Sequence, residues 1–368
     1  MNLDCLIEMS QRYGKNAEFV LDGGGNTSLK EDGVLYVKGS GVKLSDIQAE
    51  QFVAMDLIKL LAIITRDYPV SMNEAQKDEA ALADIMSARL AGEDDKRPSV
   101  EAVLHAMLPY KYVLHVHPPL INGLTCSAEG SDACKRLFGD KAVWIDISKP
   151  GLMLAGKCDK AFKAYSQKHG NCPQITLLQN HGIFIAAETV DEIDKLMYYA
   201  VSTVKGKIKE MPLFEAVPYD NNAVHSLKSA FHSVSFATAA PHTAVFCTNK
   251  QILKFVTNEK SFLPIRKSFT PDNVVMYGDE ALFISLESDT KTNPVISIIT
   301  DEFAKFNAKH GHNPIIVALQ NLGFFALGES EDTAKRVESS FLDAIKIATY
   351  ATSFGGIGTE SMNTQLSY

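Results

Sequence analysis

The feature that most constrains the fold is an internal repeat. Residues 168–184 align without a gap with residues 309–325, at an offset of 309 − 168 = 141, and ten of the seventeen aligned residues are identical. A stretch with helical periodicity follows both copies. Agreement at this level predicts two copies of one structural unit. We therefore expect two related domains, at residues 1–210 and 223–368, joined by a segment that contains two prolines.

Strand and helix patterns alternate along the chain. Apolar and β-branched runs predict strands at 112–116 and 142–147 and a strand pair at 174–187, and a turn at Asp32-Gly33 predicts a hairpin over 26–38. Segments with helical periodicity separate these strands. This order predicts an α/β fold in which helices cover a mixed β-sheet.

Two segments are less regular. Ser45, followed three residues later by Gln48, predicts the start of a helix that runs through Gln51 to about Arg66. In the second half, residues 269–276 combine Thr-Pro-Asp-Asn with Val-Val-Met. That combination predicts a turn followed by a strand.

Composition and charge exclude several classes of protein. The net charge is 36 − 44 = −8 and no long basic run occurs, so nucleic acid is not expected as a partner. No stretch reaches eighteen consecutive apolar residues, and the N-terminus lacks the apolar run of a signal peptide. Six cysteines are scattered without a CxxC pair, which is typical of reduced thiols. These features predict a cytoplasmic protein without a membrane span.

Three histidines in the first half predict a metal site. His115 and His117 lie two residues apart on a predicted strand, so their side chains point to the same face, although two hydrogen-bonded histidines in a half-buried strand are the alternative. His181 lies in a turn between apolar strands, where packing explains an imidazole poorly. Three histidines suit a catalytic Zn²⁺ with one open position, and nickel, cobalt or manganese are alternatives. Glu101 and His105 lie one helical turn apart and either could face the metal, with a core or supporting role favoured for His105.

Two glycine turns are candidates for binding an anion. Residues 22–28 and 39–41 combine glycine with Asn, Thr and Ser, and such turns can present backbone N–H groups to a phosphate. Neither turn matches the GxxxxGK[ST] or GxGxxG pattern, which argues against a nucleoside triphosphate or NAD. Ser99, at the predicted start of a helix, could add a hydroxyl to the same site while it caps that helix.

The order of these motifs resembles the class II aldolase/adducin family. In chain order the motifs are Gly25-Asn26-Thr27-Ser28, Lys38-Gly39-Ser40-Gly41, Pro98-Ser99-Val100-Glu101, His115-Val116-His117-Pro118 and Gln179-Asn180-His181-Gly182. They cover about residues 5–205 and look most like the aldolase portion of bifunctional rhamnulose-1-phosphate aldolase/dehydrogenases, whose dehydrogenase portion is not expected in this chain. The resemblance implies a three-layer α/β/α domain and, because family members are commonly tetramers, a homo-oligomer.

The resemblance also implies roles for individual residues. The family's three catalytic zinc ligands match His115, His117 and His181, and its acid/base glutamate matches Glu101. Its phosphate site matches residues of the two glycine turns and of the Pro-Ser-x-Glu motif, namely Asn26, Thr27, Ser40, Gly41 and Ser99. Val100 stands where the family has a second serine, which removes one hydroxyl from the phosphate site.

The activity implied is that of a metal-dependent aldolase, a lyase that cleaves a ketose 1-phosphate into dihydroxyacetone phosphate and an aldehyde. Alternatives are 4-epimerisation of a pentulose phosphate or dehydration of a sugar phosphate on the same metal site, and a non-catalytic, adducin-like interaction protein. The second half has Leu322 in place of His181 and lacks a His-x-His motif. We therefore expect the second domain to be a degenerate, non-catalytic copy.

Overall fold

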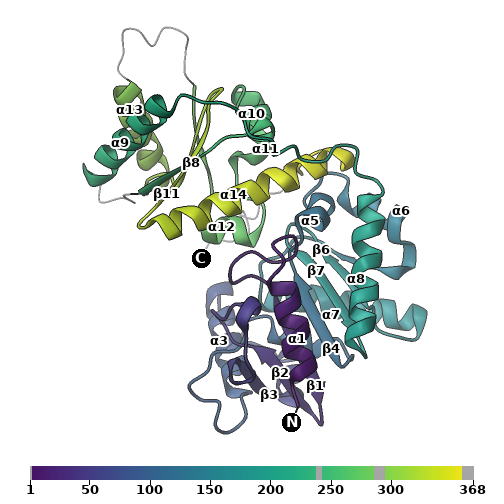
Figure 1. The fold of residues 1–368 in the computed structure, drawn as a ribbon. Coiled ribbons are helices and arrows are strands. Elements are labelled where there is room, and N and C mark those ends of the chain that lie inside the picture. Colours follow the sequence, from purple (N-terminus) through teal and green to yellow (C-terminus); the bar gives the residue numbers. More distant parts are fainter. Residues whose placement is uncertain (1, 238–242, 286–294, 359–368) are drawn as a thin grey trace. The chain divides into compact units, whose positions relative to one another are not determined.

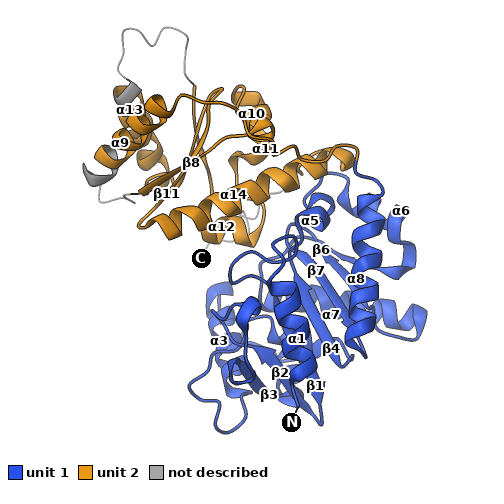
Figure 2. Cartoon of the chain, in the orientation of Figure 1, with its two compact units in different colours: residues 1–208, 365–368 blue, residues 209–364 orange. Residues whose placement is uncertain are grey.

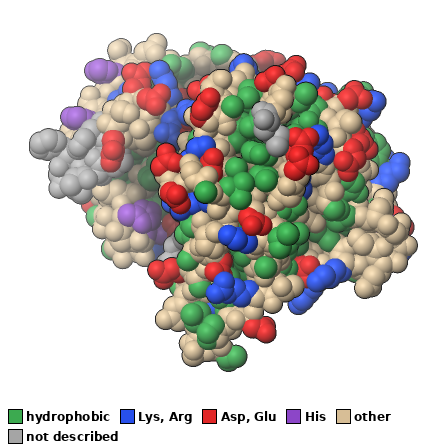
Figure 3. Space-filling view, turned by 90° about the horizontal axis from the view of Figure 1, so that it is seen from below, with side chains coloured by type: hydrophobic (Ala, Val, Ile, Leu, Met, Phe, Trp, Pro, Cys, Tyr) green, Lys and Arg blue, Asp and Glu red, His purple; other side chains and the backbone are tan. Residues whose placement is uncertain are grey.

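The chain divides into two compact units, residues 1–208 with 365–368 and residues 209–364 (Figures 1 and 2). The computed structural model describes residues 2–237, 243–285 and 295–358. No helix within these described residues combines the length and the apolar character that a membrane span requires. On the face seen in Figure 3, Lys and Arg side chains are interspersed with Asp and Glu side chains.

The first unit is a seven-stranded sheet with helices on both faces (Figure 1). Its strands are β1 (Asn26–Glu31), β2 (Val34–Lys38), β3 (Phe52–Asp56), β4 (Tyr112–Val116), β5 (Val143–Ile145), β6 (Ile175–Leu178) and β7 (Gly182–Ala187). Its α-helices are α1 (Asp4–Gly14), α2 (Leu57–Ile64), α3 (Glu74–Ser87), α4 (Ala102–Met107), α5 (Pro119–Thr125), α6 (Gly130–Phe138), α7 (Leu152–His169) and α8 (Val190–Lys205). Helices α2, α4 and α7 pack on one face of the sheet, and α1, α5 and α8 pack on the other.

The order of the strands is β3-β2-β1-β4-β7-β6-β5. All neighbours are antiparallel except β5 and β6, so the predicted mixed sheet between helix layers is confirmed. The central strand β4 lies between β1 and β7. Asn26 pairs with His115, and His115 pairs in turn with Phe184. The start of β1, the end of β4 and the start of β7 therefore meet at one place.

The helix predicted to open at Ser45 and to run through Gln51 to about Arg66 is wrong in its first part. Phe52–Asp56 forms strand β3, which pairs with β2, and α2 begins only after Asp56. The Asp56 carboxylate caps α2 by accepting the N–H groups of Ile58 and Lys59. Ser45 caps no helix of this length, because only short 3₁₀ turns (Leu44–Asp46 and Ala49–Gln51) precede the strand.

The second unit is built on a four-stranded sheet. Its strands are β8 (Thr243–Cys247), β9 (Leu282–Ile284), β10 (Ile316–Leu319) and β11 (Gly323–Gly328). Its α-helices are α9 (Asn221–Ala237), α10 (Lys250–Phe255), α11 (Glu259–Arg266), α12 (Pro271–Tyr277), α13 (Val295–His310) and α14 (Glu331–Ala351). The strand predicted within 269–276 is wrong: this segment forms α12, because Thr270 caps the helix and Pro271 occupies its first position.

The second sheet reproduces half of the first. Its order, β8-β11-β10-β9, matches β4-β7-β6-β5, with one parallel outer pair and two antiparallel pairs in both sheets. The turn between the two central strands is also repeated, with Asn180 at φ 57° in the first unit and Asn321 at φ 59° in the second. The structural repeat thus extends well beyond the aligned segment of sequence.

The pairing register shows what replaces the histidines in the second unit. At the 141-residue offset Phe184 corresponds to Phe325, which pairs with Phe246 as Phe184 pairs with His115. Phe246 therefore occupies the position of His115, and Leu322 occupies that of His181. Phe246 and Leu322 pack against the apolar cluster between the sheet and helices α9 and α13. The equivalent place in the second unit belongs to a hydrophobic core.

Candidate metal centre and active site

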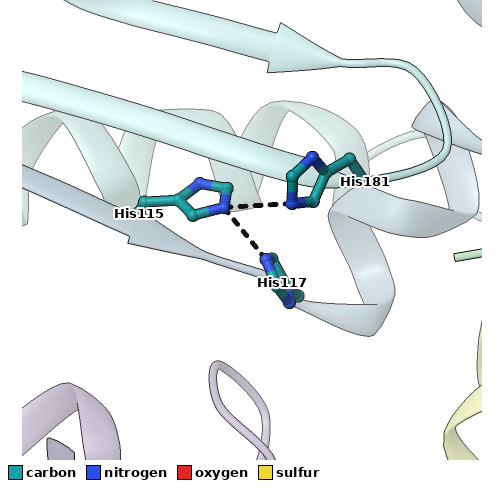
Figure 4. A group of neighbouring side chains, drawn as sticks. All are labelled: His115, His117 and His181. Carbon is teal, nitrogen blue, oxygen red and sulfur yellow. Dashed lines mark hydrogen bonds between the residues drawn. The ribbon is translucent and has the colours of Figure 1, made fainter. Parts of the chain in front are cut away.

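The three histidines of the first unit converge at the end of β4. Figure 4 shows His115 on the strand, His117 just beyond it and His181 in the turn that leads into β7. The Nε2 atom of His115 lies 3.0 Å from Nε2 of His117 and 3.3 Å from Nε2 of His181. Two nitrogens bound tetrahedrally to one metal at about 2.0–2.1 Å are roughly 3.3 Å apart. The imidazoles are therefore spaced as ligands of one ion.

The ring of His115 is held in the orientation that a metal ligand needs. Its Nδ1 atom lies 3.0 Å from the carbonyl oxygen of Ile183. Because a carbonyl only accepts hydrogen bonds, Nδ1 carries the proton, and the lone pair of Nε2 points to the other histidines. The Phe184 ring stacks on the imidazole, with ring centres 4.0 Å apart, and fixes its plane.

The turn that carries His181 requires glycine at position 182 and is held by a hydrogen bond from α5. A Cβ atom at Gly182 would lie 2.6 Å from the carbonyl oxygen of Val116 and 2.7 Å from Cδ2 of His117. Only glycine lets β7 approach β4 this closely. From helix α5, the Asn122 amide donates a hydrogen bond to the carbonyl oxygen of His181 at 3.1 Å.

Glu101 places a carboxylate beside the histidines. Its Oε2 atom lies 3.5 Å from Nε2 of His115, and its Oε1 atom lies 3.6 Å from Nε2 of His181. The side chain is buried, and Oε1 has no hydrogen-bond partner within the described residues. A buried carboxylate oxygen without a partner is costly unless a cation, a proton or a substrate completes it. This donor set, three imidazoles and one carboxylate, fits a divalent transition metal.

A buried hydrogen-bonded chain orients Glu101. The amide nitrogen of Asn26 donates a hydrogen bond to Oε2 of Glu101 at 2.7 Å. Oδ1 of Asn26 therefore faces Nε2 of His105 and accepts a hydrogen bond from its N–H group. Nδ1 of His105 then accepts the hydroxyl of Ser28 at 2.7 Å. Burial lowers the pKa of His105 well below its usual value, so the ring stays neutral and can both donate and accept. The supporting role expected for His105 agrees with this geometry.

The two glycine turns are joined by a buried lysine. The Lys38 ammonium donates to the carbonyl oxygens of Gly23 and Gly25 at 2.8 and 2.9 Å. The backbone N–H of Ser40 donates to the carbonyl oxygen of Arg97 at 2.7 Å, which brings the second turn beside Ser99. Some polar groups of the two turns predicted to bind an anion are therefore hydrogen-bonded within the chain. Both residues of the second turn that were predicted to meet a phosphate, Ser40 and Gly41, are exposed.

Three of the predicted phosphate residues differ in what their side chains do. The Asn26 side chain is engaged by Glu101 and His105, as described above. The Thr27 side chain lies on the opposite face of β1, where its hydroxyl pairs at 2.7 Å with the hydroxyl of Ser10 on α1 and is fully buried. The structure therefore does not bring the Thr27 side chain to the site. The Ser99 hydroxyl accepts the backbone N–H of Glu101 at 3.2 Å at the start of α4.

Comparisons with known proteins point to one family. The model of a family described as "Class II Aldolase and Adducin N-terminal domain" matches residues 5–208. Among curated proteins, the uncharacterized oxidoreductase YuxG of Bacillus subtilis is 30% identical over 195 residues, which are 50% of this chain and 26% of that protein. The chain thus spans about a quarter of the length of this relative.

Two solved structures are similar to part of the chain. The N-terminal class II aldolase domain of a conserved protein from Thermoplasma acidophilum is 28% identical, with a TM-score of 0.47, over 56% of this chain and 93% of that chain. A structure of L-fuculose 1-phosphate aldolase is 17% identical, with a TM-score of 0.37, over 63% of this chain and 97% of that chain.

Proposed function

Because the chain belongs to the class II aldolase and adducin N-terminal domain family, we propose that its first unit is a metal-dependent aldolase, a lyase acting on a ketose 1-phosphate. The products are dihydroxyacetone phosphate and an aldehyde. The observation that carries the proposal is the meeting of three imidazole Nε2 atoms with the buried Glu101 carboxylate at the end of β4. Burying three imidazoles and a carboxylate together costs stability, and an adducin-like interaction protein has no function that would require these buried groups.

Zn²⁺ is the metal we propose for His115, His117 and His181, and when bound it supplies Lewis-acid stabilisation of negative charge on the substrate oxygens. The C4 hydroxyl loses its proton to a base, the C4–O bond becomes a carbonyl, and the C3–C4 bonding pair stays on C3. Glu101 delivers a proton to C3, which completes dihydroxyacetone phosphate. Its burial beside the histidines keeps it in reach of that carbon and away from water.

Asn26 and His105 have a positioning role in this proposal. The Asn26 amide holds Oε2 of Glu101, and Oε1 is left to face the substrate. Because His105 is neutral and fixed by Ser28, it sets which end of the Asn26 amide faces Glu101. A positioned acid/base group raises the rate only while its orientation is kept, so this buried chain is part of the proposed catalytic site.

The phosphate of the substrate is proposed to bind at the exposed second turn, near Ser40, Gly41 and Ser99. Remote binding at this turn would hold the reacting carbons beside Glu101. Val100 projects an exposed apolar side chain where a hydroxyl is expected from the resemblance. We therefore expect the phosphate to be bound less tightly than by a site that has both hydroxyls.

The test is release of dihydroxyacetone phosphate from a panel of ketose 1-phosphates, measured with glycerol-3-phosphate dehydrogenase and NADH after the protein is loaded with Zn²⁺. Glu101→Gln is expected to retain the metal and to lose activity by about 10²–10⁴-fold. The matched control is Glu129→Gln, an exposed glutamate of the same unit, which should keep full activity. Undiminished activity of Glu101→Gln would refute the proposed role. Product analysis of the same panel separates cleavage from epimerisation and dehydration.

The proposal extends to the whole chain. The second unit has a structural role, since apolar Phe246 and Leu322 fill the places of two metal ligands.

The protein is proposed to be a cytoplasmic homo-oligomer. Its free cysteines suit a reducing compartment, and burial raises the pKa of Cys134 and Cys158 to about 12, which keeps these thiols protonated. Light scattering on the purified protein tests the oligomer.

A further inference from the structure

The second unit contains another cluster of metal-ligating side chains, Asp279, His310 and His312. Each offers one ligand atom, and these atoms all lie within 4.8 Å of one another. His310 is the last residue of α13. Gly311 then reverses the chain at φ 76°, while its N–H donates to the carbonyl oxygen of Asn307, and His312 returns toward the helix end. Asp279 comes from the segment between α12 and β9.

The distances within this cluster are short. Nδ1 of His310 lies 3.3 Å from Oδ2 of Asp279, and Nε2 of His312 lies 3.6 Å from Oδ1 of Asp279. A second carboxylate, that of Glu280, lies 3.7 Å from Nε2 of His310. The ring of Phe306 stacks on the His310 imidazole, with ring centres 4.2 Å apart, and fixes its plane.

The two nitrogens of the buried His310 ring have different surroundings. The His310 side chain is only 8% exposed, yet its Nε2 atom has no hydrogen-bond partner within the described residues. A buried imidazole nitrogen of this kind needs a partner to offset the loss of water. Glu280 lies beside this nitrogen and also accepts the Lys309 ammonium at 3.0 Å, whereas Asp279 lies beside the other nitrogen of the ring. The local charge therefore favours a cation on the Asp279 side of the imidazole.

The first unit shows the same place without the complete cluster. At the 141-residue offset His310 corresponds to His169 and His312 corresponds to Asn171. The strand β9 pairs with β10 in the same register in which β5 pairs with β6, and by this register Asp279 is the equivalent of Asp140. Asp140 forms an exposed ion pair with Lys168 at 2.8 Å.

The neighbouring charge also differs between the copies. By the same register Glu280 corresponds to Lys141. The second copy therefore has one more imidazole, in His312, and a carboxylate in place of an ammonium group. Both differences increase the attraction for a cation. Within the second unit this cluster lies at the end of α13, whereas the counterparts of His115 and His181 are Phe246 on β8 and Leu322 between β10 and β11.

We propose that Asp279, His310 and His312 bind a divalent transition metal ion in the second unit, separately from the site in the first. Two imidazoles and a carboxylate are the donor set of many zinc sites. His312 is 46% exposed, so the ion can enter from solvent and keep a position for water. The ion ties the end of α13 to the segment before β9.

The test is the number of Zn²⁺ equivalents bound by the chelator-stripped full chain, titrated in competition with a chromophoric chelator. The wild-type chain is expected to bind two. His312→Asn, which introduces the residue of the first copy, should bind one, with affinity at the second site weakened by more than about 100-fold. His225→Asn removes an exposed histidine of the same unit and should still bind two.

A variant of the first unit makes the assignment specific. His115→Ala combined with His117→Ala should retain one equivalent, and that equivalent should be lost when His312→Asn is added. The proposal is overturned if His312→Asn binds as much Zn²⁺ as the wild type, or if the first-unit variant binds none. Because these outcomes are counted as bound metal, failure of the aldolase assay leaves them unaffected. Circular dichroism of His312→Asn checks that the exposed substitution keeps the fold.

Discussion

Replacing Gly182 by alanine should disturb the first unit in a way that can be calculated from the structure. The new Cβ atom would lie 2.6 Å from the carbonyl oxygen of Val116 and 2.7 Å from the ring of His117. Real Cβ atoms essentially never come closer than 3.0 Å, and ordinary contact begins at 3.4 Å. The ends of β4 and β7 must therefore separate by 3.0 − 2.6 = 0.4 Å to 3.4 − 2.6 = 0.8 Å.

This separation has two expected consequences. Overpacking at a buried site costs about 1–3 kcal/mol of unfolding free energy. A shift of this size also exceeds the tolerance of about 0.2 Å in metal–ligand distances, so Zn²⁺ affinity at the first site should fall at least about tenfold. Gly156, in the second turn of α7, provides the matched control, because a Cβ there meets nothing within 4 Å. Gly156→Ala should instead stabilise the unit by about 0.5–1 kcal/mol.

Urea unfolding followed by tryptophan fluorescence measures the change in unfolding free energy of both variants directly. The chain has one tryptophan, Trp144, and it lies on β5, so the signal reports on the first unit. With a slope of about 2–3 kcal/mol per M, Gly182→Ala should lower the midpoint by about 0.3–1.5 M and Gly156→Ala should raise it slightly. If Gly182→Ala unfolds at the wild-type urea concentration and binds Zn²⁺ equally well, the packing argument for this glycine is refuted.

Two further predictions concern buried polar groups of the first unit. Burial lowers the pKa of Lys30 to about 7. Between about pH 7 and the ordinary value of 10.5 the unfolded chain therefore binds a proton that the folded chain releases, and stability should rise with pH by at most about 1.4 kcal/mol per unit. Urea midpoints by Trp144 fluorescence at pH 7 and 9 should show this rise in the wild type and a smaller one in Lys30→Met; an equal rise in both contradicts it. His105→Phe should remove the partner of the Ser28 hydroxyl and of Oδ1 of Asn26, and cost about 1–3 kcal/mol per group. It should lower the turnover number while Zn²⁺ stoichiometry stays unchanged, and adding Ser28→Ala should restore part of the stability; loss of the metal instead would show a merely structural defect.

Much of the first unit follows from local patterns. Strand β4 was predicted with its observed bounds, because 112–116 is a short apolar run ended by proline. Strand β3 was missed because Phe52, Val53 and Met55 are all buried and merge with the apolar start of α2 without polar alternation. The capping carboxylate of Asp56 was the available signal for the boundary.

In the candidate site, too, local sequence patterns predict some of the contacts and miss others. Strand alternation was sufficient to place His115 and His117 together, and applied to β1 it also separates Asn26 from Thr27, although the prediction grouped them. The contact of Asn26 with His105 joins residues from β1 and α4 that are distant in sequence. No local pattern predicts such a pair, since it depends on how the helix packs on the sheet.

The most direct test of the central claim is aldolase activity as a function of Zn²⁺ added to the chelator-stripped protein. We use His312→Asn for this titration, so that the first unit provides the only proposed site. Release of dihydroxyacetone phosphate should rise in proportion to bound Zn²⁺ and level off at one equivalent, and a further His117→Ala change should abolish both the binding and the activity. Activity that persists in the stripped protein, or in the variant without His117, would contradict the claim that these histidines form the catalytic metal site.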